Sequence, residues 1–127
     1  MNVNQKGAVG LSKVIADLTA KGIHVFTPFD DYCPVDLIAL NTDGSTVRIQ
    51  VKYRALNSRG YYEFSARSIV NGKAKPIDRS LIDYWAAYLA DDDKIVYLPV
   101  DKLAGSSYCI KQSQIGELGE WLMPTVC

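Results

Sequence analysis

Apolar positions near the start of the chain follow the repeat of an α-helix. One face with the spacing i, i+3, i+4 and i+7 is formed by Leu11, Val14, Ile15 and Leu18. This spacing predicts a helix over residues 5–20, and Gly22 lies where a helix stop is expected. The same kind of spacing returns in Leu81, Tyr84, Trp85, Tyr88 and Leu89. It predicts a second helix, for which Ser80 can serve as the N-cap.

Short apolar or alternating runs between and after these helices predict β-strands. The clearest hairpin signal is Asn41-Thr42-Asp43-Gly44, because Asp-Gly favours the tight turn between antiparallel strands. Strands are expected over residues 23–27, 35–40, 46–54, 61–70 (one strand or two), 94–100 and 107–111. The order of elements predicts an α/β (α+β) fold with a mixed central β-sheet flanked by helices.

The 127 residues suit a single domain, with a core over about residues 6–100. The segment 101–127 is expected either to pack on that core or to form an oligomer interface. No run is long and apolar enough to span a membrane, and the start lacks the pattern of a signal peptide, so we expect a cytoplasmic protein. The widely spaced Cys33, Cys109 and Cys127, with one histidine, argue against a zinc site and favour reduced thiols.

The net charge of zero conceals a basic segment in the middle of the chain. Residues 48–79 hold eight basic and two acidic side chains, a net charge of +6. Such a segment is a local footprint for a polyanion such as nucleic acid. The alternative is a solvated face whose charges pair with the acidic segments on either side.

The predicted hairpin carries a candidate site. Asp36 interrupts an apolar strand, and the turn brings the next strand back beside it, where Gln50 and Lys52 point to one face. A carboxylate and an amide oxygen suit a hard cation such as Mg²⁺, and an ammonium could neutralise charge developing on a phosphate. The alternative is a simple salt bridge between Asp36 and Lys52.

Pro34-Val35-Asp36, then thirteen residues, then Gln50-Val51-Lys52 resembles the motif of the PD-(D/E)xK nuclease superfamily, which has the restriction-endonuclease fold. The helix sequence KGAVGLSKVIADL and the phrase TPFDDYCPVDLIAL are similar to one branch in particular, the bacterial group I intron-encoded homing endonucleases of this fold. The likeness runs from about residue 6 to residue 100, and IQVKYR is its most specific part.

The resemblance implies a role for each residue of the motif. Asp36 would be a metal ligand, Gln50 would offer a neutral oxygen in place of the second acid, and the carbonyl of Val51 would be a further ligand. Lys52 would be the catalytic lysine, and the cofactor would be Mg²⁺ or Mn²⁺. The family commonly has a glutamate after a glycine in the first helix, where this chain has Leu11 after Gly10.

The resemblance also gives the basic segment a partner. Double-stranded DNA would contact Arg54, Arg59, Lys73 and Lys75, with Arg59 the best candidate for a base contact. Because one active site cuts one strand, duplex cleavage suggests a homo-oligomer, either a dimer or a tetramer.

Three functions stay open from the sequence. The first is a site-specific DNA endonuclease of the homing type. The second is a DNA-binding protein on the same fold with impaired catalysis, which the departure at Leu11 motivates. The third is a nuclease that resolves Holliday junctions or processes RNA.

Overall fold

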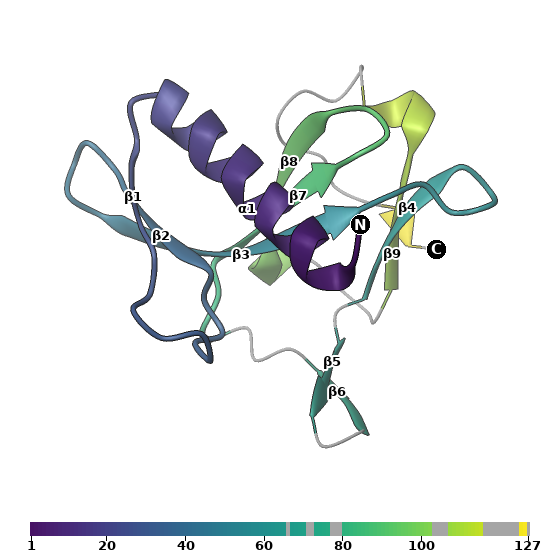
Figure 1. Ribbon diagram of the computed structural model, residues 1–127, viewed down its shortest axis with the longest axis horizontal. Coiled ribbons are helices and arrows are strands. Elements are labelled where there is room, and N and C mark those ends of the chain that lie inside the picture. Colours follow the sequence, from purple (N-terminus) through teal and green to yellow (C-terminus); the bar gives the residue numbers. More distant parts are fainter. Residues whose placement is uncertain (66, 71–72, 77–79, 103–106, 116–124, 127) are drawn as a thin grey trace.

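The computed structural model describes residues 1–65, 67–70, 73–76, 80–102, 107–115 and 125–126 (Figure 1). A five-stranded mixed sheet has the order β1-β2-β3-β7-β8, and smaller sheets have the orders β10-β9-β4 and β5-β6. The elements are α1 (Val3–Ala20), β1 (His24–Phe26), β2 (Leu37–Leu40), β3 (Thr46–Arg54), β4 (Tyr61–Ser65), β5 (Arg67–Val70), β6 (Lys73–Pro76), β7 (Tyr84–Leu89), β8 (Lys94–Pro99), the 3₁₀ turn η1 (Val100–Lys102), β9 (Ser107–Lys111), the 3₁₀ turn η2 (Gln112–Gln114) and β10 (Thr125–Val126).

Helix α1 begins two residues earlier than the apolar pattern indicated. Asn2 and Gln5 form a capping box, in which the Asn2 side chain accepts from the Gln5 amide at 2.8 Å and the Gln5 side chain accepts from the Asn2 amide at 2.8 Å. This satisfies amide groups that the first turn would otherwise leave unpaired. The helix ends before Gly22, whose φ of +79° suits glycine.

The hairpin of β2 and β3 forms as predicted, with Leu37 opposite Ile49. Its turn is closed by a hydrogen bond from the Asn41 amide to the Ser45 carbonyl at 2.8 Å, and Gly44 has a φ of +89°. On its other side β3 pairs in parallel with β7. Strand β3 therefore lies at the centre of the five-stranded sheet, and the motif residues it carries lie there too.

The helix predicted after Ser80 is wrong, because Tyr84–Leu89 is strand β7. Trp85 through Leu89 are all buried, since α1 covers one face of the sheet and the β4–β9 sheet covers the other. A strand buried on both faces is apolar at consecutive positions. Its large residues met the helical spacing by coincidence, and only the tertiary context separates the two structures.

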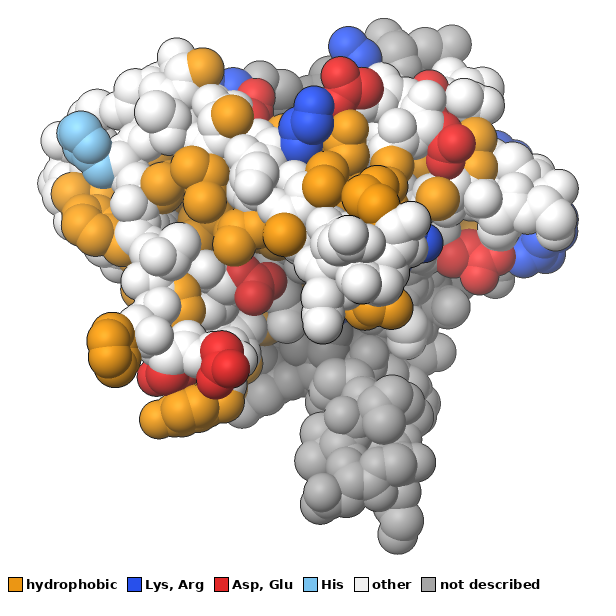
Figure 2. Space-filling model, in the orientation of Figure 1, with side chains coloured by type: hydrophobic (Ala, Val, Ile, Leu, Met, Phe, Trp, Pro, Cys, Tyr) orange, Lys and Arg blue, Asp and Glu red, His pale blue; other side chains and the backbone are white. Residues whose placement is uncertain are grey.

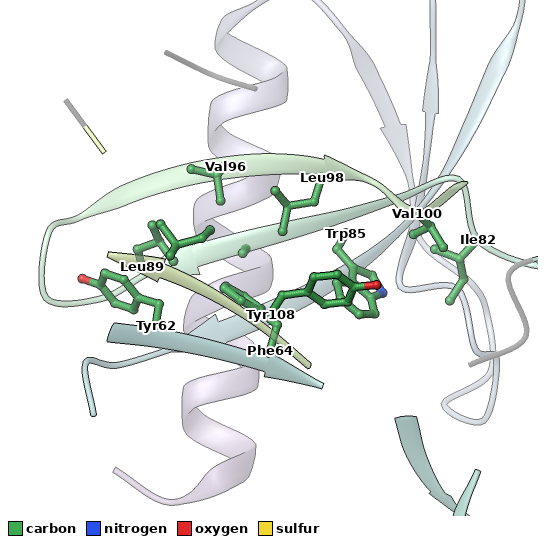
Figure 3. Packing of buried hydrophobic residues seen from close by; sticks show 11 residues of the cluster. Tyr62, Phe64, Ile82, Trp85, Leu89, Val96, Leu98, Val100 and Tyr108 are labelled. Atoms are coloured by element: carbon green, nitrogen blue, oxygen red, sulfur yellow. The ribbon is translucent and has the colours of Figure 1, made fainter. Parts of the chain in front are cut away.

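Two hydrophobic clusters lie on opposite faces of the five-stranded sheet. The first lies between α1 and the sheet and includes Val14, Leu18, Leu37 and Ile49. The second lies between β7–β8 and the β4–β9 layer, and Figure 3 shows its members facing one another across that interface. Its described members are Tyr62, Phe64, Ile82, Trp85, Ala87, Leu89, Val96, Leu98, Val100, Tyr108 and Ile110.

The remaining expectations have mixed outcomes. The strands predicted over 46–54 and 107–111 have those bounds, and the run 61–70 is two strands. Among the described residues, α1 is the one α-helix, so the second flanking layer is a sheet, not a helix. Residues 116–124 of the C-terminal segment lie outside the described residues.

The cysteines require a correction. Cys33 is a free thiol, whereas Cys109 on β9 is disulfide-bonded, so the expectation of reduced thiols is wrong for that residue. Within the described part of the chain, no helix is both long and apolar enough to cross a membrane.

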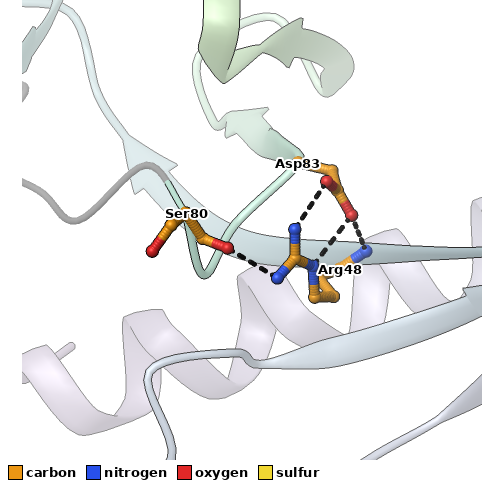
Figure 4. A network of polar contacts seen from close by, with 3 residues as sticks. All are labelled: Arg48, Ser80 and Asp83. Carbon is orange, nitrogen blue, oxygen red and sulfur yellow. Dashed lines mark hydrogen bonds and ion pairs between the residues drawn. The ribbon is translucent and has the colours of Figure 1, made fainter.

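An ion pair fixes the point where the parallel strands meet (Figure 4). The Arg48 guanidinium donates to both carboxylate oxygens of Asp83 at 2.9 and 3.1 Å and to the Ser80 carbonyl at 2.7 Å. The backbone amide of Arg48 donates to the same carboxylate at 2.8 Å, and the Asp83 amide donates to the Arg48 carbonyl at 2.9 Å. Arg48 therefore sets where β7 begins relative to β3.

This ion pair predicts a pH dependence of stability. The hydrogen bond from Arg48 holds the pKa of Asp83 below its ordinary value of 3.8. A carboxyl whose pKa is lowered in the folded state contributes fully to the free energy of unfolding at pH values above its unfolded pKa. This contribution is lost as the pH falls through its folded pKa. We expect Asp83→Asn to lower the free energy of unfolding in urea at pH 6, and the difference from the parent chain to narrow below pH 3.8. A difference that does not change with pH would contradict this account.

Candidate active site

Asp36 comes directly before β2 (Leu37–Leu40), so the prediction that it interrupts that strand is wrong, and its carboxylate lies at the edge of β3. The Asp36 amide donates to the Ile49 carbonyl at 3.0 Å, and its Oδ2 accepts from the Val51 amide at 2.7 Å. Burial raises the pKa of Asp36, while the Val51 hydrogen bond and the charge of Lys52 act in the opposite direction. The carboxylate is thus half-buried and held in place by the backbone of the motif itself.

Two neutral oxygens accompany this carboxylate. Gln50 Nε2 lies 3.4 Å from the Pro34 carbonyl, and Gln50 Oε1 is buried with no hydrogen-bond partner among the described residues. In a β-strand the amide and the carbonyl of one residue point to the same side. Because the Val51 amide donates to Asp36, the Val51 carbonyl also points toward the Asp36 side of β3. Strand β2 begins only at Leu37, opposite Ile49, so Val51 lies beyond the paired part of that edge.

Lys52 lies two residues beyond Gln50 and shares its face of the sheet. Its Nζ lies 5.3 Å from the centre of the Trp85 ring. Burial lowers the pKa of Lys52, the positive charge of Arg54 lowers it further, and the charge of Asp36 raises it. Both side chains are described, and no ion pair within 4.0 Å joins them. The structure therefore does not contain the simple Asp36–Lys52 salt bridge that the sequence left open.

Leu11 packs against the hydrophobic cluster between α1 and the sheet, as its position on the apolar face predicted. The helix approaches β3 closely here, because a Cβ placed on Gly10 would lie 3.5 Å from side-chain atoms of Val51 and Tyr53. Leu11 therefore has a packing role at this position.

The oxygen atoms of Asp36, Gln50 and Val51 are of the type that a hard divalent cation binds, although only one of these residues is an acid. Asp36 offers a carboxylate, Gln50 a buried oxygen without a partner and Val51 a carbonyl, and Mg²⁺ binds through few protein oxygens while it keeps several waters. The described residues contain no group of three or more His, Cys, Asp or Glu side chains placed to hold a metal ion. Asp36 would therefore supply the protein's negative charge at the metal.

The predicted DNA-contacting residues fall into two kinds of environment. Arg54 is half-buried and donates to the Glu63 and Tyr53 carbonyls at 2.9 and 2.8 Å, so part of its guanidinium is already used within the fold. Arg59 is exposed, and it forms an ion pair with Glu63 at 3.0 Å in the turn before β4. Of the two, Arg59 has the more accessible guanidinium.

Lys73 and Lys75 belong to β6, which pairs with β5 in a two-stranded ribbon. The ribbon extends away from the two larger sheets in Figure 1. The side chains of these lysines, and residues 71–72 between the two strands, lie outside the described part of the structure. On the face seen in Figure 2 the described basic side chains lie singly along the top and the right, next to acidic ones, so they form no basic patch there.

Sequence reasoning missed two residues next to the site. The apolar spacing predicts Trp85 on the face of a helix, whereas its position beside Gln50 depends on the parallel register of β3 and β7. Arg48 was counted only as part of the basic segment, although it forms the ion pair with Asp83. No local signal identifies either contact, because both join residues far apart in the sequence.

The helix, the mixed sheet and the motif across its central hairpin define a nuclease core. A family model described as PD-(D/E)XK endonuclease matches residues 1–116, so the chain belongs to the PD-(D/E)XK endonuclease family. This confirms the family resemblance that the motif indicated. No curated protein sequence matches the chain significantly.

The solved structures that share this fold include a homing endonuclease and a junction resolvase. The bacterial homing endonuclease I-Ssp6803I has a TM-score of 0.78 and 21% sequence identity, over 88% of this chain and 80% of that one. The Holliday junction resolvase Hjc of Archaeoglobus fulgidus, an archaeal hyperthermophile, has a TM-score of 0.53 and 18% identity, over 85% of each chain. At these identities the likeness concerns the fold, and it agrees with the predicted restriction-endonuclease-like core.

Proposed function

We propose that the chain is a site-specific double-stranded DNA endonuclease of the homing type that requires Mg²⁺ or Mn²⁺. The observation that carries this proposal is the placement on β3 of three groups: the Asp36 carboxylate at its β2-side edge, the Gln50 oxygen without a partner, and the motif lysine, whose charge acts on Asp36. Family membership and the fold shared with a bacterial homing endonuclease support it.

Each residue has a defined part in this proposal. Asp36, Gln50 and the Val51 carbonyl would hold the cation, which when bound polarises the phosphate and lowers the pKa of a bound water. Asp36 is positioned before any metal binds, because the Val51 amide already fixes one of its oxygens. The Lys52 ammonium would stabilise the negative charge that develops on the phosphate.

DNA binding is assigned to the elements that follow β3. Arg59 in the exposed turn would contact a phosphate or a base edge, and the β5–β6 ribbon has the form of a two-stranded element that the major groove admits. Cleavage of both strands would use two copies of the site in a symmetric homo-oligomer, a dimer or a tetramer.

The test is a survey of cleavage sites. The full chain is incubated with Mg²⁺ and a complex pool of duplex DNA, and all new ends are sequenced, with Lys52→Ala in parallel. Ends that cluster at one long sequence and disappear with Lys52→Ala are the expected result. No new ends from the parent chain, at concentrations where it binds duplex DNA, would contradict the proposal and favour the DNA-binding alternative.

A junction-resolving or RNA-processing nuclease is the second candidate function. The observation in its favour is the fold shared with a Holliday junction resolvase. Four-way DNA junctions and structured RNA are therefore included in the survey as competitors. Preferential cutting of either one over linear duplex would replace the homing assignment.

Leu11→Glu tests whether the site lacks an acid. A second carboxylate near the motif is expected to tighten Mn²⁺ binding about ten-fold or more, because ligand charge controls the affinity for a hard cation. The same change should destabilise the fold by about 1–3 kcal/mol, because it places a charge in a partly buried packing position. Calorimetry with Mn²⁺ and urea denaturation measure the two effects, and Leu11→Gln, which adds size without charge, is the matched control. Equal Mn²⁺ affinity in all three proteins would show that position 11 does not face the metal.

A further inference from the structure

The ammonium of Lys52 has an aromatic neighbour that the nuclease motif does not include. Gln50, Lys52 and Arg54 share one face of β3, the face opposite α1. Two cations on this face lie over buried rings of the second hydrophobic cluster: Lys52 over Trp85 at 5.3 Å and Arg54 over Phe64 at 5.5 Å. A ring face attracts a cation most strongly when water is excluded, and tryptophan attracts it best.

The register of the sheet explains how Trp85 comes to lie beneath the lysine. Gln50 is the direct partner of Trp85 in the parallel pair, and Lys52 is the partner of Ala87. Alanine leaves room at the position beside Lys52, so the lysine side chain can lean back along the strand over the ring of Trp85. The ammonium is thereby directed toward the pair of Gln50 and Trp85, where the Gln50 side chain holds its buried oxygen.

The ring is also well fixed. Trp85 is 1% exposed, and it packs among residues from β8 and from the β4–β9 layer, where Figure 3 shows it near Ile82 and Val100. The described residues provide no carboxylate within 4.0 Å of Lys52. Position 50 is an amide, and position 11 is apolar, so neither supplies a charge that could hold the ammonium.

We propose that Trp85 is a positioning residue, whose buried ring holds the Lys52 ammonium beside Gln50, on the face of β3 opposite α1, in place of an ion pair. The inference rests on the proposed nuclease function. Trp85 acts only through Lys52 and contacts no reacting atom. Its loss should therefore slow cleavage without weakening DNA binding.

The experiment compares Trp85→Phe and Trp85→Leu with Leu98→Ala, the matched control for lost packing. Leu98 is the partner of Trp85 on β8 and a buried member of the same cluster, but it contributes no ring. Removing the ring should lower kcat about ten-fold, as expected for one desolvated cation–π contact, while Kd for DNA stays unchanged. Trp85→Phe should keep most of the rate, and Leu98→Ala should keep kcat despite its lower stability.

A second measurement does not depend on cleavage. In the NMR spectrum of ¹³C-lysine-labelled protein, assigned with Lys52→Arg, the ε-methylene protons of Lys52 should be shifted upfield by the ring current of Trp85. The shift should decrease in Trp85→Phe and disappear in Trp85→Leu, and it should persist in Leu98→Ala.

The outcomes separate the two proposals. An unshifted Lys52 signal in the parent chain, or equal kcat values for Trp85→Leu and Leu98→Ala, would overturn the positioning role. A parent chain that shows the shifted signal but cuts no DNA would overturn the nuclease function and retain the placement of Lys52 over the ring.

Discussion

Lys52→Met is expected to lower the rate of DNA cleavage by roughly 10²- to 10³-fold, the effect of removing one group that stabilises transition-state charge. Methionine keeps the apolar length of the side chain and removes the ammonium. Since burial lowers the pKa of Lys52, the folded protein disfavours the charged lysine, and the free energy of unfolding should not fall. Single-turnover cleavage of the site found in the survey measures the rate, and urea denaturation measures the stability.

Lys6→Met is the control for this substitution. Lys6 is an exposed lysine in the first turn of α1, and within the described part of the chain its side chain forms no ion pair with Asp36 and no hydrogen bond with Gln50 or Lys52, so its loss should leave the rate unchanged. DNA affinity should also be similar for both variants, because in the proposed mechanism Lys52 would act on the reacting phosphate and not along the duplex. Cleavage by Lys52→Met at the parent rate would remove Lys52 from the mechanism.

Asp36→Asn should abolish measurable Mn²⁺ binding and reduce cleavage by at least about a hundred-fold, because it removes the site's one carboxylate. The free energy of unfolding of Asp36→Asn should rise or stay unchanged. Asparagine can keep the hydrogen bond from the Val51 amide through its own oxygen. It also avoids the cost of burying a negative charge, the same cost by which burial raises the pKa of Asp36. Calorimetric titration with Mn²⁺, cleavage assays and urea denaturation give the three quantities.

The matched control lies in the same hairpin. Asp43 is in the turn between β2 and β3, where its carboxylate accepts from the Ser45 amide at 2.9 Å. Asp43→Asn removes one negative charge from the hairpin but should leave Mn²⁺ affinity and cleavage unchanged. A variant Asp36→Asn that binds Mn²⁺ as the parent does would show that the metal ligands lie elsewhere.

The sequence predicted the parts of the site that depend on local structure. The Asn41–Gly44 turn fixes how β2 returns along β3, so the proximity of Asp36 and Gln50 follows from a few neighbouring residues. The apolar face of α1 likewise predicted that Leu11 packs, because a helix must bury such a face. For these residues, the pattern and the spacing were sufficient.

The contacts of β7 could not be predicted in this way. The strand lies parallel to β3, and a parallel pair requires a long connection, so its register depends on the whole chain. A helix over residues 84–89 would not place Trp85 beside Gln50. Consecutive buried residues such as Ala86 and Ala87 fit either structure, and only the layers on both faces of the sheet decide between them.

The way in which β3 and β7 are joined has an evolutionary consequence. The chain between them carries β4, which packs in the β4–β9 layer, and the β5–β6 ribbon, which pairs only with itself among the described strands. The Arg48–Asp83 ion pair fixes the point where the chain re-enters the sheet. The ribbon can therefore change in length and sequence while Asp36, Gln50 and Lys52 keep their positions. Under the proposed function, this arrangement would let the protein acquire new DNA targets without any change in its motif.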